Sequence, residues 1–385
     1  MQTNKAVNLI GIVGAGAMGS GIAQIASQAG QDVVLFDLSK EALTTSAAKL
    51  QKVMNRLIEK GRVTSDEATA IQERIEKTTV ISRLKDCDLI VEAVVEDLDI
   101  KKRVFKQIEE IVSKEAIIAS NTSSLSITSL ASFCNHPERV IGLHFFNPAP
   151  LMPLVEIIPA LQTKSDLPQH LTDLMIKWGK SPVIAKDTPG FIVNRVARPF
   201  YGEALRILDE GIADVKTIDA AMRESGFRMG PFQLTDLIGH DVNYSVTESV
   251  FKSFYFDPRY MPSITQLKLV EAGWLGRKTG RGFYNYNEEN EEAVVHGTLD
   301  SKIQAEISER IISMLINEAS DAVYLGIASA EDVDTAMLKG VNYPKGLLSW
   351  ADEWGLKKVV STIDGLRETY GETRYRCSPL LRKLA

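Results

Sequence analysis

The chain has 385 residues, 44% of them hydrophobic and 24% charged, and its net charge is −6. This length exceeds what one hydrophobic core usually serves, so we expect two or three domains in a chain of ordinary globular composition. The acidic balance argues against nucleic acid as a partner, no apolar run approaches the ~20 residues of a membrane span, and the N-terminus lacks the form of a signal peptide.

The three cysteines are Cys87, Cys134 and Cys377, and they lie in unrelated contexts. Their spacing gives neither a set of metal ligands nor a disulfide framework. We therefore expect no metal, a reducing compartment and a cytoplasmic location.

The first 37 residues predict a strand over 7–13, a helix over 20–29 and a second strand over 31–36. Between the first strand and the helix lies Gly14-Ala15-Gly16-Ala17-Met18-Gly19, which matches G-x-G-x-x-G in the context that a dinucleotide-binding loop requires. A glycine turn that binds nothing is the alternative.

Each glycine of this loop has a separate task. Gly14 permits the tight turn, Gly16 lets the backbone approach a pyrophosphate, and Gly19 lets the helix pack on the strand. The start of the helix offers free N–H groups to the phosphates. Asp37 follows Gly14 by 23 residues, where a carboxylate can hold ribose hydroxyls and would repel a 2′-phosphate. NAD is therefore favoured over NADP.

Residues 38–81 predict two helices with a break near 61–64. Basic residues at spacings of 3, 4 and 4 share one face of the first helix, which suits a phosphorylated carrier; a solvated helix face is the alternative. These residues are Lys49, Lys52, Arg56 and Lys60.

Residues 87–95 predict a strand buried on both faces of a parallel sheet, with Glu96 at its C-terminal end and so facing the cofactor region. A helix is expected over 99–112, where Lys101 in the first turn opposes the helix dipole and suggests a role outside the helix. A further strand over 116–119 ends in Ser120-Asn121-Thr122-Ser123-Ser124. The alternative for that cluster is a loop in which one serine caps the helix near Ile127.

Residues 139–158 predict a strand, a proline-rich loop and a second strand. Glu156 lies inside the second apolar strand, where an unpaired carboxylate would cost several kcal/mol, so it needs a partner. His144 is the nearest candidate, and a histidine held by a carboxylate suits a general base. A surface glutamate and an unrelated core histidine are the alternative.

The composition changes after Pro182, and the chain beyond that residue is expected to be mostly helical. Residues 187–194 predict a linker and a helix start, and helices are expected over 197–210 and 215–222. Residues 276–286 form a glycine-rich, basic stretch, for which a plain surface loop is the simplest interpretation.

Seven motifs occur in an order that resembles the L-3-hydroxyacyl-CoA dehydrogenase family, in the branch that includes 3-hydroxybutyryl-CoA dehydrogenases. They cover roughly residues 5–287 and are GAGAMGSGIA, IVEAVVED, SNTSSL, GLHFFNP, LVEII, DTPGFIVNR and GRKTGRGFYNY. The resemblance implies NAD as cofactor and an acyl-CoA substrate. It implies that His144 and Glu156 are a catalytic pair, that Ser123 and Asn194 contact the substrate, and that the basic helix receives the CoA moiety, with Lys60 as the best match. A serine of the family one turn earlier on that helix is not clearly present. The NAD contacts implied are the Gly14–Gly19 loop with Asp37, Glu96, Lys101, Ser123, Asn147 and Lys278.

The C-terminal half of the chain contains an internal repeat with an offset of 115 residues. Glu203-Ala204 and 211–222 recur as Glu318-Ala319 and 326–337, and 236–239 resembles 352–355 at one residue more. Glu309 stands where the first copy has Asn194, so the second copy keeps the fold and not the substrate contacts. Short family members dimerise through this helical domain, and a second copy could take the partner's place within one chain.

We therefore expect an α/β Rossmann-type domain with an inserted helical pair over 1–184, followed by two all-α copies over 185–287 and 296–385. An acidic linker over 287–300 would join the copies, in an intramolecular pseudo-dimer that is a monomer, or else in a homodimer. The expected activity is reversible NAD-dependent oxidation of short-chain (S)-3-hydroxyacyl-CoA. A dehydrogenase of the gulonate 3-dehydrogenase/λ-crystallin type is the alternative enzyme. A non-enzymatic redox sensor is a third possibility, which would have lost the histidine or the glutamate.

Overall fold

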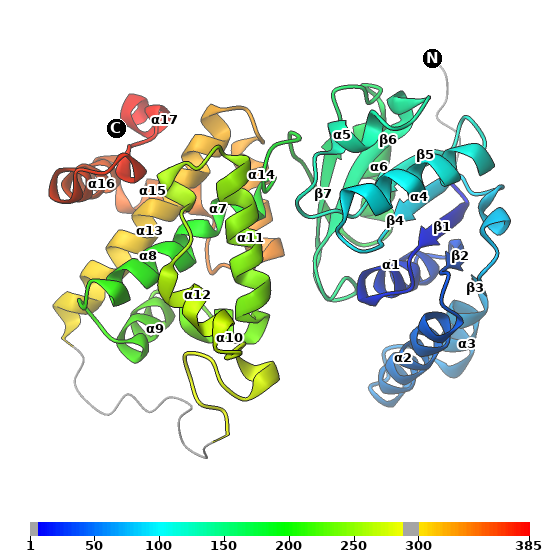
Figure 1. Ribbon diagram of the computed structural model, residues 1–385, viewed down its shortest axis with the longest axis horizontal. Helices are drawn as coiled ribbons and strands as arrows, with labels where there is room; N and C mark the ends of the chain where they lie inside the picture. The colour runs from blue at the N-terminus through cyan, green and yellow to red at the C-terminus, as the bar shows by residue number, and fades with distance from the viewer. Residues whose placement is uncertain (1–6, 288–299) are drawn as a thin grey trace. The chain divides into compact units, whose positions relative to one another are not determined.

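A computed structural model of the chain describes residues 7–287 and 300–385 (Figure 1). Its contacts divide the chain into two compact units, Met1–Thr188 and Pro189–Ala385. The first is an α/β unit and the second is helical, so the coarse prediction of a Rossmann-type domain followed by a mostly helical part is confirmed. Most of the predicted acidic linker, residues 288–299, lies outside the described residues.

The first unit is built on an eight-stranded sheet in which every neighbouring pair is parallel except β6 and β7. The strand order reverses beside β1, which is the topological switch point where open α/β sheets bind ligands. Across the sheet the strands are β3 (Ile75–Thr78), β2 (Asp32–Phe36), β1 (Leu9–Val13), β4 (Leu89–Glu92), β5 (Ile117–Ser120), β6 (Val140–Phe145), β7 (Leu154–Pro159) and β8 (Ser181–Ile184).

One hydrophobic core lies between the sheet and four helices, namely α1 (Ala17–Gln28), α2 (Lys40–Glu59), α3 (Ser65–Glu73) and α6 (Leu167–Lys177). Helices α4 (Leu98–Ile111) and α5 (Ile127–Ala131) contribute buried residues outside that core. The space beside Gly142 of β6 is filled by Ile127 of α5, whereas its strand neighbours Ile141 and Leu143 belong to the core cluster. Since strand residues alternate in direction, His144 points to the same face of the sheet as Gly142, away from that core.

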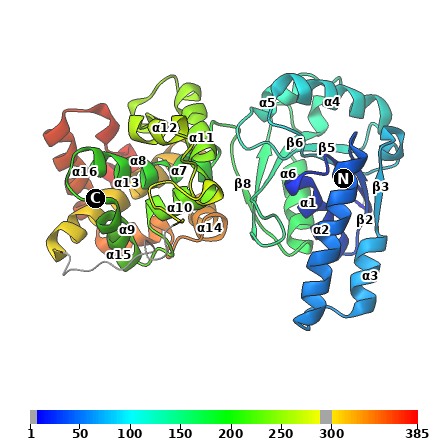
Figure 2. The ribbon, with the colours of Figure 1, turned by 60° about the horizontal axis from the view of Figure 1, so that its bottom comes forward.

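The two helices predicted between residues 38 and 81 are present as α2 and α3, which lie side by side and extend beyond the sheet (Figure 2). Ser39 caps the first helix, and Thr64 and Glu67 form a reciprocal capping box at the start of the second. The apolar positions Leu43, Leu50 and Met54 are buried, which leaves the basic residues of α2 exposed.

Three local predictions for this unit were wrong. The short edge strand β3 was not predicted, because residues 75–78 have only one fully buried side chain and two charged ones. Strand β4 ends at Glu92 instead of residue 95, so Glu96 lies in the following turn. The cap of α5 is Ser126, which lies outside the predicted cluster 120–124.

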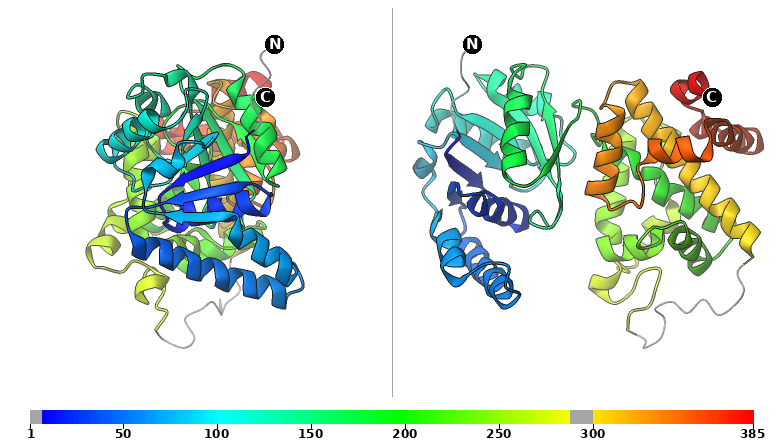
Figure 3. Two further views of the ribbon diagram at one scale, coloured as in Figure 1. Left: turned by 90° about the vertical axis from the view of Figure 1, so that its right-hand side faces the viewer. Right: turned by 180° about the vertical axis from the view of Figure 1, so that it is seen from behind.

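The second unit is a helical bundle in which the long helix α13 (Ser301–Tyr324) runs through the middle (Figures 1 and 3). It is buried almost continuously from Arg310 to Ala322, so the charged side chains within this stretch, among them Arg310 and Glu318, need partners inside the bundle. The other helices before the undescribed segment are α7 (Val193–Val196), α8 (Arg198–Asp209), α9 (Val215–Glu224), α10 (Pro231–Ile238), α11 (His240–Ser253) and α12 (Ile264–Glu271). Those after it are α14 (Ala330–Gly340), α15 (Leu347–Trp354), α16 (Leu356–Tyr370) and α17 (Pro379–Leu384). None of the helices in the described part of the chain combines the length and apolar character that a membrane crossing requires.

Candidate active site

His144 and Glu156 face each other directly across the antiparallel pair β6 and β7. The His144 Nδ1 atom lies 2.6 Å from Glu156 Oε2, the carboxylate is fully buried, and the imidazole is 6% exposed. The ring of Phe146 packs against the imidazole in a tilted arrangement, with 4.4 Å between the ring centroids. The predicted partner of the buried glutamate is therefore the residue that contacts it, and the carboxylate fixes which imidazole nitrogen bears the proton facing it.

The polar loop after β5 lies beside the end of β6, because Ser120 and Gly142 are partners in the parallel ladder. Asn121 Oδ1 accepts the backbone N–H of Phe145 at 2.9 Å, which ties this loop to the residue after His144. Ser123 is half-buried in the same loop. The serine and the histidine therefore both lie at the carboxyl ends of parallel strands, where ligands bind in sheets of this type.

The glycine loop has the geometry that its sequence predicts. Gly14 has φ +106°, and a Cβ atom there would lie 2.7 Å from the carbonyl oxygen of Ala93. A Cβ at Gly19 would lie 1.8 Å from the carbonyl oxygen of Gly14, so both positions exclude a side chain. Gly16 instead faces open space at the N-terminus of α1. This space is where a phosphate group would accept backbone N–H groups.

Asp37 at the end of β2 holds the glycine loop from the other side. Its Oδ2 accepts the backbone N–H of Ala15 at 2.7 Å, and its Oδ1 accepts that of Ser39 at 2.8 Å. A cavity of about 620 Å³ borders Gly16 and Asp37 and has a largely apolar wall formed by Phe36, Val94 and other side chains. Its size and position suit a nucleoside.

Glu96 and Lys101 form a charged cluster with a residue that the sequence analysis missed. Lys101 Nζ lies 2.6 Å from Glu92 and 3.3 Å from Glu96, and the lysine is 1% exposed. Glu92 is fully buried and also accepts the Ser120 hydroxyl at 2.6 Å. Like Glu156, Glu92 is a carboxylate within an apolar strand. The sequence analysis missed it because the predicted strand extended to residue 95, whereas β4 ends at Glu92.

Glu96 organises the serine loop through several hydrogen bonds. It accepts the Thr122 hydroxyl at 2.6 Å, the Ser123 backbone N–H at 3.0 Å and the Ser124 hydroxyl at 2.9 Å. Burial alone would raise the pKa of Glu96, but Lys101 and these hydrogen bonds hold it below its usual range. The carboxylate is therefore charged at neutral pH and holds Ser123 in place.

The basic face of α2 forms one wall of a second groove, of about 940 Å³. Lys49, Arg56 and Lys60 line it, whereas Lys52 of the predicted stripe does not. The lining also includes the exposed Asn147 and the loop that follows it. Apolar side chains of α2 lie between the cations, so the groove can accept an apolar chain that bears phosphates.

Lys180 is a second residue that the sequence analysis missed. Its Nζ donates to the carbonyl oxygens of Ala149 at 2.6 Å and Met152 at 2.9 Å, which fixes the loop after Asn147. Burial lowers the pKa of Lys180 to about 8. No pattern in the sequence marks this lysine, because its partners are backbone atoms.

Two of the predicted site residues belong to the second unit. Asn194 is half-buried in α7. Lys278 lies in the glycine-rich stretch and contacts both carboxylate oxygens of Asp241, at 2.5 and 2.7 Å. The structure therefore brings His144, Glu156, Ser123 and the glycine loop together within one unit, and it describes Asn194 and Lys278 within the other.

Comparison with known families accounts for nearly the whole chain. A family model described as the NAD-binding domain of 3-hydroxyacyl-CoA dehydrogenase matches residues 9–188. A second, described as the C-terminal domain of 3-hydroxyacyl-CoA dehydrogenase, matches residues 190–286 and 307–385.

Individual relatives agree with the family models. The chain is 36% identical to 3-hydroxyadipyl-CoA dehydrogenase of Escherichia coli (strain K12), with 98% of each chain covered. It is 43% identical to a probable 3-hydroxybutyryl-CoA dehydrogenase of Deinococcus radiodurans, with 72% of this chain and 99% of that relative covered. Among solved structures, a 3-hydroxybutyryl-CoA dehydrogenase from Escherichia coli matches with a TM-score of 0.94 at 36% identity, covering 99% of this chain and 98% of that one.

Proposed function

The chain belongs to the 3-hydroxyacyl-CoA dehydrogenase family, and on that premise we propose that its His144–Glu156 pair oxidises short-chain (S)-3-hydroxyacyl-CoA to 3-ketoacyl-CoA, reversibly. It is an NAD-dependent oxidoreductase. The observation that supports the catalytic assignment is the 2.6 Å contact between a nearly buried imidazole and a fully buried carboxylate. The relatives' names include both a butyryl and an adipyl group, and both are short acyl chains.

The residues of the first unit fit NAD. The open space at Gly16 would be filled by any Cβ atom, and it lies at the start of a helix whose N–H groups can meet a pyrophosphate. Asp37 keeps acceptor capacity for ribose hydroxyls beyond its two backbone contacts. The full proposed set consists of Gly14, Ala15, Gly16, Ala17, Met18, Gly19, Asp37, Glu96, Lys101, Ser123, Asn147 and Lys278.

His144 acts as the general base in this proposal. Because Glu156 engages Nδ1, the proton of the C3 hydroxyl passes to Nε2. The imidazole becomes cationic in that step, and the adjacent carboxylate stabilises the cation, as it does in a catalytic triad. NAD, when bound, supplies the acceptor for the hydride. In the reverse direction, the His144 imidazolium returns the proton to the oxygen.

Ser123 and Asn194 are proposed to hydrogen-bond the reacting oxygen or the thioester carbonyl. The network around Glu96 supports the first assignment, because Glu96 accepts the backbone N–H of Ser123 at 3.0 Å and so holds this residue in place. The assignment of Asn194 rests on the family resemblance. The assignment of Lys278 to the nicotinamide side of the cofactor rests on the same resemblance.

The groove beside α2 is the proposed site of the CoA moiety. Lys60 is the main candidate for a phosphate contact, with Lys49 and Arg56 on the same wall. An anionic carrier in a chain of net charge −6 needs such a local group of cations. The inserted helical pair would thus serve substrate binding.

We also infer that the helical unit consists of two copies of one domain, over 185–287 and 296–385. Helices α8 to α11 correspond in order to α13 to α16. Gly239 and Gly355 have positive φ angles of 100° and 83° at matching helix junctions. Asp219 accepts backbone N–H groups at the start of α10, and Asp334 does the same at the start of α15. These shared details support a duplication.

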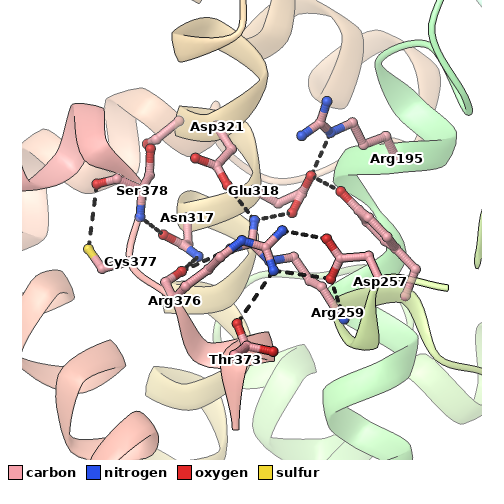
Figure 4. A network of polar contacts seen from close by, with 12 residues as sticks. Arg195, Asp257, Arg259, Asn317, Glu318, Asp321, Thr373, Arg376, Cys377 and Ser378 are labelled. Atoms are coloured by element: carbon pink, nitrogen blue, oxygen red, sulfur yellow. Dashed lines mark hydrogen bonds and ion pairs between the residues drawn. The ribbon is translucent and has the colours of Figure 1, made fainter. Parts of the chain in front are cut away.

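Buried ion pairs connect the two proposed copies. Glu318 of α13 is fully buried and accepts Arg195 Nε at 2.6 Å, Arg259 Nη1 at 2.8 Å and the Tyr260 hydroxyl at 2.5 Å (Figure 4). Asp321 shares the same Arg259. These three donors to Glu318 all come from the first copy.

The reciprocal ion pair has its carboxylate in the first copy, at Glu203 of α8, which is also fully buried. It accepts Arg310 Nε at 2.9 Å and the Tyr375 hydroxyl at 3.1 Å, both from the second copy. Residue numbers in this cluster differ by 115 from those of Arg195, Tyr260 and Glu318. Such a reciprocal pattern is the property of an isologous two-fold interface.

We therefore propose an intramolecular pseudo-dimer of helical domains, which allows the chain to act as a monomer. The mass of the full-length protein in solution, by sedimentation equilibrium, tests this. A homodimer assembled through the first copy alone would contradict the proposal, because that surface is then occupied by another chain. We propose the cytoplasm as its location, in keeping with three cysteines that are all free thiols.

The experiment that tests the proposed function is a turnover assay of His144→Gln. We expect the variant to lose nearly all reduction of acetoacetyl-CoA while NADH still binds, because the imidazole moves the proton and the glycine loop holds the cofactor. A parallel loss of NADH affinity would contradict the assigned role. Assaying the parent protein with acetoacetyl-CoA and with gulonate separates the proposed activity from that of the gulonate 3-dehydrogenase/λ-crystallin type.

A further inference from the structure

Lys101 is a buried cation at the edge of the sheet that contains the proposed NAD site. Its side chain is 1% exposed, and its ammonium nitrogen lies 2.6 Å from Glu92, 3.3 Å from Glu96 and 3.5 Å from the carbonyl oxygen of Val94. A lysine has three N–H donors, so these three acceptors account for all of them. The nicotinamide ring of NAD+ carries a positive charge, which a cation nearby would repel. A lysine in this place therefore needs its charge compensated.

Glu92 supplies the compensating charge from a fully buried position in β4. Its Oε1 contacts the Lys101 ammonium and also accepts the backbone N–H of Val94 at 2.7 Å. Its Oε2 accepts the Ser120 hydroxyl at 2.6 Å, so both oxygens are held in place. A buried ion pair is weak evidence for a role in stability, because well-packed apolar side chains of similar volume often stabilise a fold equally well. Stability alone therefore does not account for the pair.

Glu96 is a second carboxylate on the same cation, and it differs from Glu92 in exposure. Its side chain is 36% exposed, with Oε2 facing Lys101 and Oε1 accepting hydrogen bonds from the serine loop. Burial opposes the ionisation of Glu96, but Lys101 and these hydrogen bonds lower its pKa. We call Glu92, Lys101 and Glu96 the carboxylate–lysine group. One positive and two negative charges leave this group with a net charge of −1, and Glu96 is its exposed member.

The strand order places the carboxylate–lysine group between the glycine loop and His144. The nucleoside cavity borders Asp37 after β2, and the open space for the phosphates lies at Gly16 after β1. Beyond β1 the sheet continues with β4, then with β5 and its serine loop, and then with β6, which contains His144. A dinucleotide that runs in this direction has its nicotinamide half beyond β4 and β5. Strands β4 and β6 are two strand spacings, about 10 Å, apart, so a ring between the group and His144 is within about 10 Å of that charge.

We propose that Glu92 neutralises Lys101, so that the carboxylate–lysine group keeps a net negative charge that favours binding of NAD+ over NADH. The inference rests on the NAD site of the proposed function and adds Glu92 to that site as a positioning residue, which acts through Lys101 and Glu96. The two forms of the cofactor differ in charge only at the nicotinamide ring, so the ratio of their dissociation constants reports this effect alone. One unit charge at about 10 Å changes the ratio by roughly 2- to 15-fold for effective dielectric constants between about 80 and about 20.

The test measures Kd for NADH by its fluorescence and Kd for NAD+ by displacement of NADH, at one fixed pH. Glu92→Gln keeps the shape of the side chain and brings the charge of the group to zero, so the ratio of Kd for NAD+ to Kd for NADH should rise by about 5-fold. Lys101→Met changes the charge in the opposite direction, so the ratio should fall, or stay unchanged if a carboxylate takes up a proton. The double variant Glu92→Gln/Lys101→Met again has one negative charge and should return the ratio to the parent value.

Two exposed positions in the same unit give matched controls with the same chemical changes. Glu115→Gln lies just before β5, and Lys106→Met lies at an exposed position of α4, so neither should change the ratio. If Glu92→Gln does not fold, Glu96→Gln removes one negative charge at the exposed member of the group and should raise the ratio in the same way. Losses of affinity that apply equally to both cofactor forms cancel in this measurement.

An equal weakening of NAD+ and NADH binding in Glu92→Gln, or in Glu96→Gln where that variant replaces it, would overturn the inference, because the carboxylate would then act only in folding. A higher ratio in Lys101→Met would overturn it as well, since the effect of charge would have the wrong sign. The proposed function depends on a different measurement. A parent protein that binds both cofactor forms but turns over no 3-hydroxyacyl-CoA would contradict the proposed function and leave these ratios valid.

Discussion

Replacing Glu156 by Gln keeps the shape of the side chain and removes the charge beside His144. The contact is 2.6 Å long and buried, so the centres of the two charged groups lie about 4 Å apart. At an effective dielectric constant of about 20, one unit charge at that distance is worth about 4 kcal/mol to an imidazolium. Since only part of this charge has developed in the transition state, we expect turnover to fall by about 10² to 10³-fold.

The assay is the initial rate of acetoacetyl-CoA reduction, followed by the absorbance of NADH at saturating concentrations of both substrates. Binding of NADH, measured by fluorescence titration, should be unchanged, because the glycine loop follows β1 and Asp37 follows β2, whereas this pair lies on β6 and β7. Glu115→Gln, the same chemical change at an exposed position, is the control. A turnover number of Glu156→Gln within about 3-fold of the parent, which is under 1 kcal/mol, would refute the role of the carboxylate.

Three further outcomes are expected. Lys60→Ala should raise KM for acetoacetyl-CoA by about 2 to 5-fold without changing kcat, as for the loss of one exposed cation near a phosphate, and an unchanged KM at low salt would count against the CoA groove. Glu318→Gln should lower the free energy of unfolding by about 3 to 5 kcal/mol in denaturant titrations, because it leaves Arg195 and Arg259 buried without a full counter-charge; a loss below 1 kcal/mol would show that the network is not needed for stability. Burial alone would raise the pKa of Glu318, but Arg259 and Arg195 lower it to about 2. Its contribution to stability is therefore complete above the unfolded-state pKa near 4.5 and is lost as the pH falls toward 2. Glu318→Gln should accordingly weaken the decrease of the free energy of unfolding between about pH 4.5 and pH 2.

The sequence was informative wherever local patterns decide the structure. The glycine loop, the capping box of Thr64 and Glu67, and the pairing of Glu156 with His144 all rest on neighbours in the chain or in one hairpin. A buried carboxylate in an apolar strand is costly enough that its partner can be predicted. The repeat was detectable because identical letters recur at a constant spacing.

The features that could not be predicted depend on contacts between distant segments. Glu92 pairs with Lys101 and Ser120 only because β4, α4 and β5 meet, and the apolar run past Glu92 hid the end of its strand. Lys180 holds backbone carbonyls, which have no sequence signature. The reciprocal pairing of Arg195 with Glu318 and of Arg310 with Glu203 requires the two helical stretches to be packed against each other before it can be recognised.

That reciprocal pairing ties the evolution of the two helical stretches together. A substitution of Glu203 removes the counter-charge of Arg310, which lies more than a hundred residues away along the chain. A change in either helical stretch therefore favours a compensating substitution in the other. If the second helical stretch were replaced by that of a distant homologue, the arginine and tyrosine of the homologue would have to pair with Glu203, although they evolved beside a different carboxylate. Cut between residues 287 and 300 and co-expressed, the two fragments should recover activity by complementation, since each supplies the countercharges that the other lacks.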